Sequence, residues 1–146
     1  MRKFIKIIFL FTLFFLIGCK VSWVPEYNSV LEEKIIIGAK LNDKLYLDMG
    51  INQDTNSRNY NNWITRYNEI ELEINSIKFM NETREKNEDM LKIVGNLSST
   101  FLQYKNEHKV SRHLSDGQII LYNEYIKAKW LPLLKAEIAL KNIRKK

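Results

Sequence analysis

The chain has 146 residues, 45% of them hydrophobic and 27% charged, and its formal net charge is +6. This length is typical of a single domain. One cysteine excludes an intrachain disulfide and a cysteine-rich zinc site, and two histidines leave little for a histidine-based metal centre. Two prolines and five glycines exclude the collagen-like class and the Pro/Gly-rich disordered class.

The first 18 residues differ in character from the rest of the chain. Three basic residues within the first six positions precede an apolar run from Ile7 to Ile17, which only Thr12 interrupts. A basic start, a short apolar run and then small residues form the pattern of a secretion signal. The run is too short to span the apolar core of a bilayer, which takes ~20 residues. We therefore expect residues 1–18 to be a cleaved signal peptide.

The apolar run ends in the sequence Leu16-Ile17-Gly18-Cys19. This sequence resembles the lipobox of bacterial lipoprotein precursors, in which an apolar residue, a tolerated position and a small residue precede an invariant cysteine. The resemblance covers the first 19 or 20 residues. It implies a diacylglyceryl group on Cys19, cleavage before Cys19, and acylation of the new amino terminus by a chain such as palmitate.

Lipidation of Cys19 implies that the membrane is a partner and that the protein lies in the bacterial cell envelope. Two or more acyl chains give stable anchoring, whereas one chain binds only marginally. The modification also uses the only thiol of the chain. In Gram-negative families an Asp after the cysteine tends to retain a lipoprotein in the inner membrane, so Lys20 favours the outer membrane if the organism is Gram-negative.

The mature protein would be residues 19–146, with 20 Lys and Arg against 17 Asp and Glu. Residues 19–26 comprise the lipidated cysteine and a short tether, which contains Pro25. At ~3.3 Å per residue this tether reaches ~20 Å. The domain itself is then expected at residues 27–146, close to the bilayer and with a basic C-terminal end.

Four stretches of this domain carry apolar residues at three- and four-residue steps, the spacing of an amphipathic helix. They are residues 27–49, 59–80, 88–109 and 115–142. No stretch shows the sustained alternation that is typical of a strand. The sequence therefore predicts an all-α domain, an antiparallel bundle of about four helices. The charged segment 81–87 is either a loop or a junction within one longer helix.

The fourth stretch carries two local features. Ser115 and Gln118 have the spacing of a capping box, which predicts the start of a helix there. Pro132 lies inside the same stretch and is expected to kink the helix.

In an antiparallel bundle the loops 52–59 and 111–117 would lie at the end remote from the membrane. Their candidate partner-binding residues are Arg58, Arg112, His113 and Asp116. Loops on a rigid scaffold often carry function, and this end is therefore the expected contact surface for a protein partner. Plain solvated loops are the alternative.

The C-terminal end of the fourth helix would return to the membrane side. Its basic residues are Lys141, Arg144, Lys145 and Lys146. Near an anionic lipid surface each such charge contributes ~1 kcal/mol. A solvated helix end, where cations suit the helix dipole, is the simpler interpretation because acylation already supplies an anchor.

Catalytic and metal-binding patterns are missing from the sequence. On a helix His108 and His113 would lie about 140° apart, and they cannot share a ligand face. No phosphate-binding loop, dinucleotide-binding glycine motif, nucleophile elbow or metalloprotease helix occurs. We expect no metal, no cofactor, no nucleic-acid partner and no enzymatic activity.

These features favour a membrane-anchored, non-enzymatic module of the cell envelope that binds a protein partner or acts as an accessory. A structural envelope lipoprotein is one alternative, in which anchoring matters more than the exposed faces. Another is a bundle that binds a small ligand beside the aromatic stripe Tyr60, Trp63 and Tyr67, although this spacing is typical of a helix core. Exclusion and immunity lipoproteins are also compact and anchored, an analogy at the level of the fold alone.

Overall fold

A computed structural model describes residues 24–51, 54 and 56–144. Its four long helices are α2 (Ser29–Ile51), α3 (Ile64–Glu82), α4 (Glu88–Ser111) and α5 (Asp116–Arg144), and a short 3-10 helix, η1 (Tyr60–Asn62), precedes α3. No strand occurs in these residues, and the predicted all-α fold is confirmed. The expected signal peptide, Cys19 and most of the tether lie outside the described residues.

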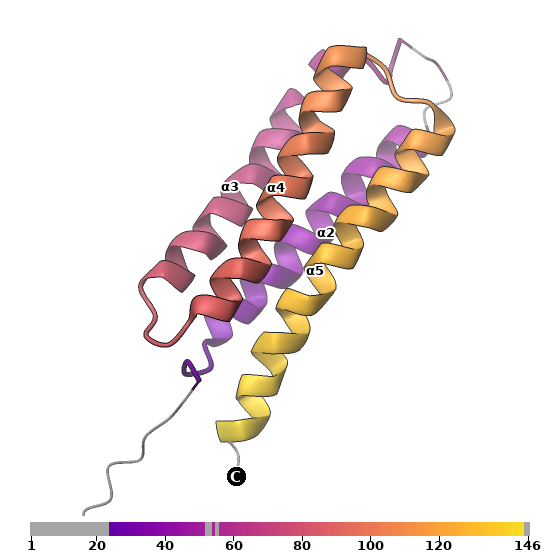
Figure 1. The fold of residues 1–146 in the computed structure, drawn as a ribbon. Helices are drawn as coiled ribbons and strands as arrows, with labels where there is room; N and C mark the ends of the chain where they lie inside the picture. The colour runs from indigo at the N-terminus through magenta and orange to yellow at the C-terminus, as the bar shows by residue number, and fades with distance from the viewer. Residues whose placement is uncertain (1–23, 52–53, 55, 145–146) are drawn as a thin grey trace, which may run out of the picture.

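The four helices form an up-and-down antiparallel bundle (Figure 1). In cyclic order α2 packs against α5 and α3, and α4 packs against α3 and α5. The N-terminal segment and the C-terminal end of α5 lie at the same end of the bundle (Figure 1). We call the end formed by residues 24–28, 83–87 and 137–144 the basal end, and the end formed by residues 56–63 and 109–116 the distal end.

The apolar stripes of the four helices meet in a single core. Every member of the stripe that leads into α3 is buried, namely Tyr60, Trp63, Tyr67, Ile70, Ile74 and Ile77. The rings of Tyr60 and Tyr67 stack with their centroids 5.7 Å apart, and Trp63 Nε1 donates a hydrogen bond to the Ser57 carbonyl over 2.9 Å. The interpretation of this aromatic stripe as core is therefore confirmed.

The connections between helices settle the alternatives that the sequence left open. Residues 83–87 form a loop between α3 and α4, and these two helices are separate. At the start of α5, Ser115 Oγ accepts from the Gln118 amide over 3.3 Å, and Gln118 Oε1 accepts from the Ser115 amide over 3.0 Å. The predicted capping box is thus present, and Pro132 lies inside α5 as predicted.

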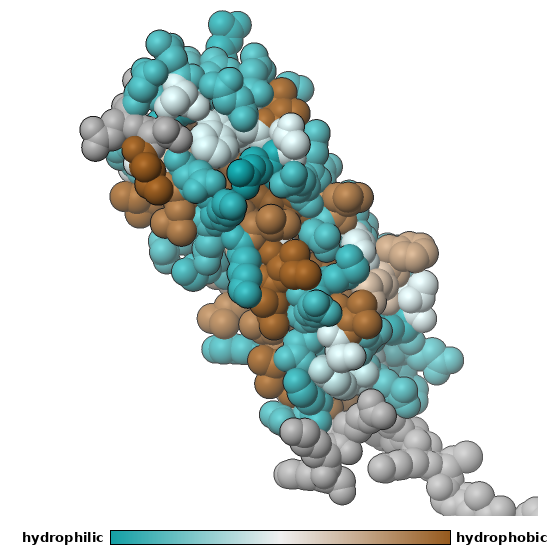
Figure 2. Space-filling view, turned by 180° about the vertical axis from the view of Figure 1, so that it is seen from behind, coloured by the Kyte–Doolittle hydropathy of each residue, from teal (hydrophilic) through white to brown (hydrophobic). Residues whose placement is uncertain are grey.

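No helix in the part of the chain that the structure describes is both long and apolar enough to traverse a bilayer. Figure 2 shows the face of the bundle that is hidden in Figure 1. Apolar and polar side chains are mixed along this face, and the distal end, at the top, is largely hydrophilic.

Candidate functional site

The distal end is held together by a buried arginine. The side chain of Arg58 is only 8% exposed; its Nε donates to the Met49 carbonyl over 3.1 Å, and its Nη1 lies 2.6 Å from Asp116 Oδ1. Arg58 therefore ties the end of α2 to the start of α5. Arg58 was a candidate partner contact in the sequence; the structure buries most of its side chain, and these two contacts lie within the bundle.

His108 forms the second part of this distal framework. It is fully buried on α4. Nε2 lies 2.9 Å from the Arg58 carbonyl, and Nδ1 lies 3.0 Å from the Tyr67 hydroxyl. A carbonyl oxygen only accepts, so Nε2 carries the proton and Nδ1 accepts from the tyrosine. Burial lowers the pKa of His108 below its ordinary value of 6.5, and the charge of His113 acts in the same direction.

Arg112 ends α4 in a backbone conformation that is uncommon for a side-chain-bearing residue. Its φ is 65°, in the left-handed region. This turn directs the Arg112 carbonyl toward the start of η1, where it accepts from the Tyr60 amide over 2.8 Å. The backbone of Arg112 is therefore fixed against η1, and its side chain is exposed.

A surface pocket of about 550 Å³ lies between η1 and the end of α4. It is lined by Asn59, Tyr60, Asn61, Ile64, Lys109 and Arg112. Two of these side chains are cationic and none is acidic. The sequence pointed to Arg112 but not to its grouping with Lys109 and the asparagines, which depends on the contact between Arg112 and η1; the only local signal was that Lys109 precedes Arg112 by three residues.

The four candidate residues of the distal loops thus have different roles. Arg58 and Asp116 form an internal pair in which the Asp116 side chain stays 80% exposed. Arg112 is exposed and lines the pocket, whereas His113 is half-buried and is not among the lining residues.

The basal end contains a buried ion pair that joins three parts of the chain. Arg84 Nη1 lies 3.0 Å from Oε2 of Glu137, and the Glu137 side chain is fully buried. Arg84 also donates to the Glu26 carbonyl and, over 3.2 Å, to Asn81 Oδ1. Glu137 Oε1 accepts from the Asn28 amide over 2.7 Å at the start of α2. The segment that enters α2 is therefore bound to both α5 and the 83–87 loop.

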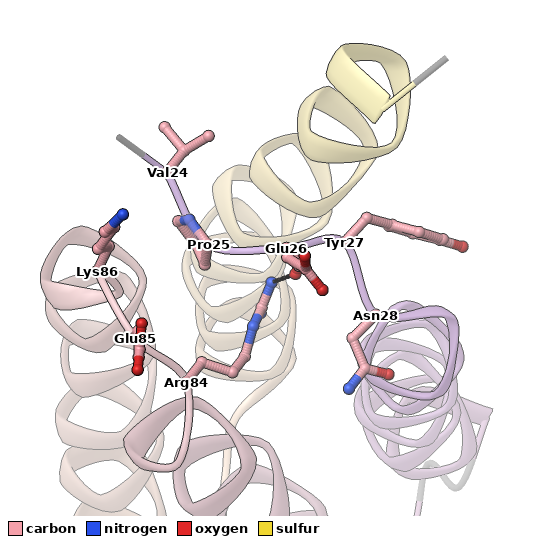
Figure 3. Close-up of a pocket in the computed structure, with 8 residues that line it drawn as sticks. All are labelled: Val24, Pro25, Glu26, Tyr27, Asn28, Arg84, Glu85 and Lys86. Carbon is pink, nitrogen blue, oxygen red and sulfur yellow. Dashed lines mark hydrogen bonds between the residues drawn. The ribbon is translucent and has the colours of Figure 1, made fainter. Parts of the chain in front are cut away.

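The same segment borders a second pocket of about 450 Å³ (Figure 3). Figure 3 shows Arg84 reaching from the loop toward Glu26, with Tyr27 pointing away from it. The pocket is lined by both charge signs: Arg84 and Lys86 are basic, and Glu26 and Glu85 are acidic. The guanidinium of Arg84 already belongs to the buried network, and we assign this pocket no ligand.

Of the basic residues proposed as lipid contacts, the structure describes the side chain of Lys141 alone. Lys141 lies 3.0 Å from Glu32 Oε2 and 5.3 Å from the ring centroid of Tyr27, so it already has partners within the bundle. Its neighbour Glu32 has a lowered pKa because it accepts from the Tyr27 hydroxyl and from Lys141. Arg144 is the last residue of α5, and its side chain, Lys145 and Lys146 lie outside the described residues.

Comparison with known proteins adds no assignment to these sites. The chain matches no protein-family model, no curated protein and no solved structure.

Proposed function

We propose that the protein is a bacterial lipoprotein, anchored to the cell envelope through Cys19, which binds a protein partner at its distal end without catalysing a reaction. The sequence Leu16-Ile17-Gly18-Cys19, preceded by a basic and an apolar segment, supports the anchor. In a Gram-negative organism Lys20 favours the outer membrane.

One observation carries the proposal: the described chain begins at Val24, which leads into α2 at the end opposite the distal loops (Figure 1). Val24 is only five residues beyond Cys19, and five residues span at most ~18 Å. A lipid on Cys19 would therefore hold the basal end close to the head groups. The 23 residues of α2 extend ~35 Å, which would hold the distal end clear of the lipid.

The basal ion pair supports this arrangement. Glu26 and Asn28, at the start of the domain, are bonded to Arg84 and Glu137 inside the bundle. The tether is therefore joined to a rigid body at its base. An anchored bundle of this kind presents its distal loops away from the membrane, where a protein of the envelope can reach them.

The anchor is tested by replacing Cys19 with Ala in cells that receive labelled palmitate. We expect the label to be lost. Arg112→Glu is the matched control, because it changes the distal end and should leave the label and the membrane association unchanged. Retention of label by the Cys19→Ala protein would contradict the proposed anchor, whereas membrane association alone would not, because the apolar run 7–17 stays attached when cleavage before Cys19 is blocked.

The partner is tested by lysine crosslinking on membranes with mass spectrometry of the products. We expect one dominant protein attached to the wild type and lost when Lys109 and Arg112 are both replaced by Glu. Attachment only to many abundant neighbours, unchanged in the variant, would favour a structural envelope role instead.

A further inference from the structure

The distal pocket combines cationic, amide and apolar groups on a fixed framework. Lys109 and Arg112 stand three residues apart at the end of α4, and Asn59 and Asn61 flank Tyr60 on the other side. Ile64, which is 37% exposed, supplies an apolar surface between them.

The two cations of this pocket have no anion to balance them. Among residues 24–51, 54 and 56–144, no carboxylate lies within ion-pair distance of Lys109 or Arg112, whereas Arg58 and Arg84 both have acidic partners. Two like charges that lie close together repel each other. An incoming anion would relieve this repulsion.

The start of α3 adds positive potential on the same side. Its first turn contains no acidic residue, and its N-cap, Trp63, forms no side-chain capping bond. The amide groups at a helix start carry a partial positive charge. Ile64, the first residue of α3, lines the pocket, so the start of α3 borders the same site as Lys109 and Arg112.

The framework beneath the pocket is already ordered. The Arg112 carbonyl accepts from the Tyr60 amide, and Asn59 Oδ1 accepts from the Asn61 amide over 3.0 Å. His108 and Arg58 bond to each other below this surface. Binding here would order few additional backbone residues, which lowers the entropic cost of association.

We propose that this pocket binds an acidic segment of a protein partner, with a carboxylate between Lys109 and Arg112 and an adjacent apolar side chain against Ile64. The inference rests on the proposed function in one respect, namely that the bound partner is a protein. Arg is well suited to carboxylates because its planar guanidinium makes paired, charge-assisted hydrogen bonds. In the proposed arrangement α2 holds the pocket ~35 Å from the anchored end, so the protein's own bilayer does not supply the anion.

The test measures binding of a fluorescein-labelled peptide of alternating glutamate and leucine to the full chain in detergent micelles. The matched probe replaces every glutamate by glutamine, and inorganic phosphate is the small-anion competitor. The pocket variant is Lys109→Glu/Arg112→Glu. The control, Lys40→Glu/Lys44→Glu, makes the same charge change on exposed residues of α2 outside the pocket.

We expect the acidic peptide to bind the wild type and the control with affinities within about twofold, and to bind the pocket variant at least about tenfold more weakly. The affinity should fall as salt is added, because exposed charges are screened. Lys109→Gln/Arg112→Gln should also weaken binding, by less than the charge reversal, because it removes the attraction without placing acids at the C-terminal end of α4.

Three results would overturn the inference: failure of the acidic peptide to bind the wild type, equal binding by the pocket variant, or equal binding of the glutamine peptide. Binding of phosphate alone would identify a small-anion site and would also overturn it. The palmitate readout of the Cys19→Ala protein does not depend on this pocket, so failure of the anchor is recognised separately.

Discussion

Arg84, in the 83–87 loop, and Glu137, on α5, form an ion pair at the basal end although the apolar stripe of α5 does not predict a charge there. Nη1 and Oε2 are 3.0 Å apart, and the side chains are 11% and 0% exposed. Glu137 occupies an inward-facing position of α5 between the buried residues Leu133 and Leu140. A carboxylate can remain in such a position only when nearby groups compensate its charge, here Arg84 and the Asn28 amide.

Glu137→Gln should therefore destabilise the protein strongly. The change removes the negative charge and leaves the Arg84 guanidinium in the interior without compensation. Breaking one side of a buried ion pair typically costs about 3–5 kcal/mol of unfolding free energy. Urea unfolding measures the loss, and Glu33→Gln on the exposed face of α2 is the control, with a change within about 0.5 kcal/mol.

The paired replacement Arg84→Met/Glu137→Leu separates the contribution of the ion pair from the cost of leaving one buried charge unpaired. Removing both charges together should recover most of the loss of the single variant, since an apolar pair of similar volume requires no charge compensation. If Glu137→Gln unfolds at the same urea concentration as the wild type, the pair contributes little and the basal network is not what holds the segment 24–28.

A close approach between α2 and α5 gives a second prediction. A Cβ added at Gly38 would lie 3.0 Å from Cζ3 of the Trp130 ring and closer still to Cη2. Trp130 is buried and has little room to move. Gly38→Ala should therefore cost about 1–3 kcal/mol by overpacking, more than the 0.5–1 kcal/mol that alanine gains in a helix.

Gly95 provides the matched control on α4. Nothing lies within 4 Å of a Cβ built there, so Gly95→Ala should raise the unfolding free energy by about 0.5–1 kcal/mol. The two alanine variants should shift the thermal midpoint in opposite directions. A stabilising effect of Gly38→Ala would mean that α2 and α5 pack less closely than the structure indicates.

The helices were predictable because each stripe repeats at helical spacing over five or six turns. The boundaries differ by a few residues, most at α3, where residues 60–62 form η1 and the α-helix begins at Ile64. Local spacing cannot distinguish these two helix types. Glu137 escaped prediction because its partner is 53 residues away in the sequence.

The position of the distal site was predictable from the sequence, but the separate roles of its residues were not. Loop position and charge drew attention to Arg58 and Arg112 alike, and both are arginines near helix ends. Only the structure distinguishes them. Arg58 is buried and contacts the Met49 carbonyl and Asp116, whereas the side chain of Arg112 faces solvent. Burial of a charged side chain depends on long-range contacts that one sequence does not reveal.

Replacing Arg58 should consequently lower the stability of the bundle and leave binding of the acidic peptide unchanged. Arg58→Met removes the bond to the Met49 carbonyl and should lower the unfolding free energy by about 1–3 kcal/mol. Asp116→Asn should lower it by less than about 1 kcal/mol, because that end of the pair is exposed to solvent. Chemical unfolding measures both, and peptide binding by the folded Arg58→Met protein should match the wild type. Equal stability losses for the two variants would contradict the burial of Arg58.

His108 makes the stability of the bundle depend on pH. Burial lowers the pKa of His108 below 6.5, so the unfolded chain takes up a proton more readily than the folded one. The folded state is then favoured fully above pH 6.5 and loses stability as the pH falls toward the lowered value. The slope from one such group is at most about 1.4 kcal/mol per pH unit.

Protonation acts on a specific hydrogen bond. Nδ1 accepts from the Tyr67 hydroxyl in the neutral ring, and a protonated Nδ1 cannot accept. His108→Gln retains a donor and an acceptor but does not titrate, so its urea midpoint should vary less between pH 7.5 and pH 5 than that of the wild type. Its stability at pH 7.5 should be lower, because the amide fills less of the space between Tyr60 and Tyr67. Parallel pH profiles for the two proteins would show that His108 does not titrate on unfolding, and the pH dependence would then belong to carboxylates.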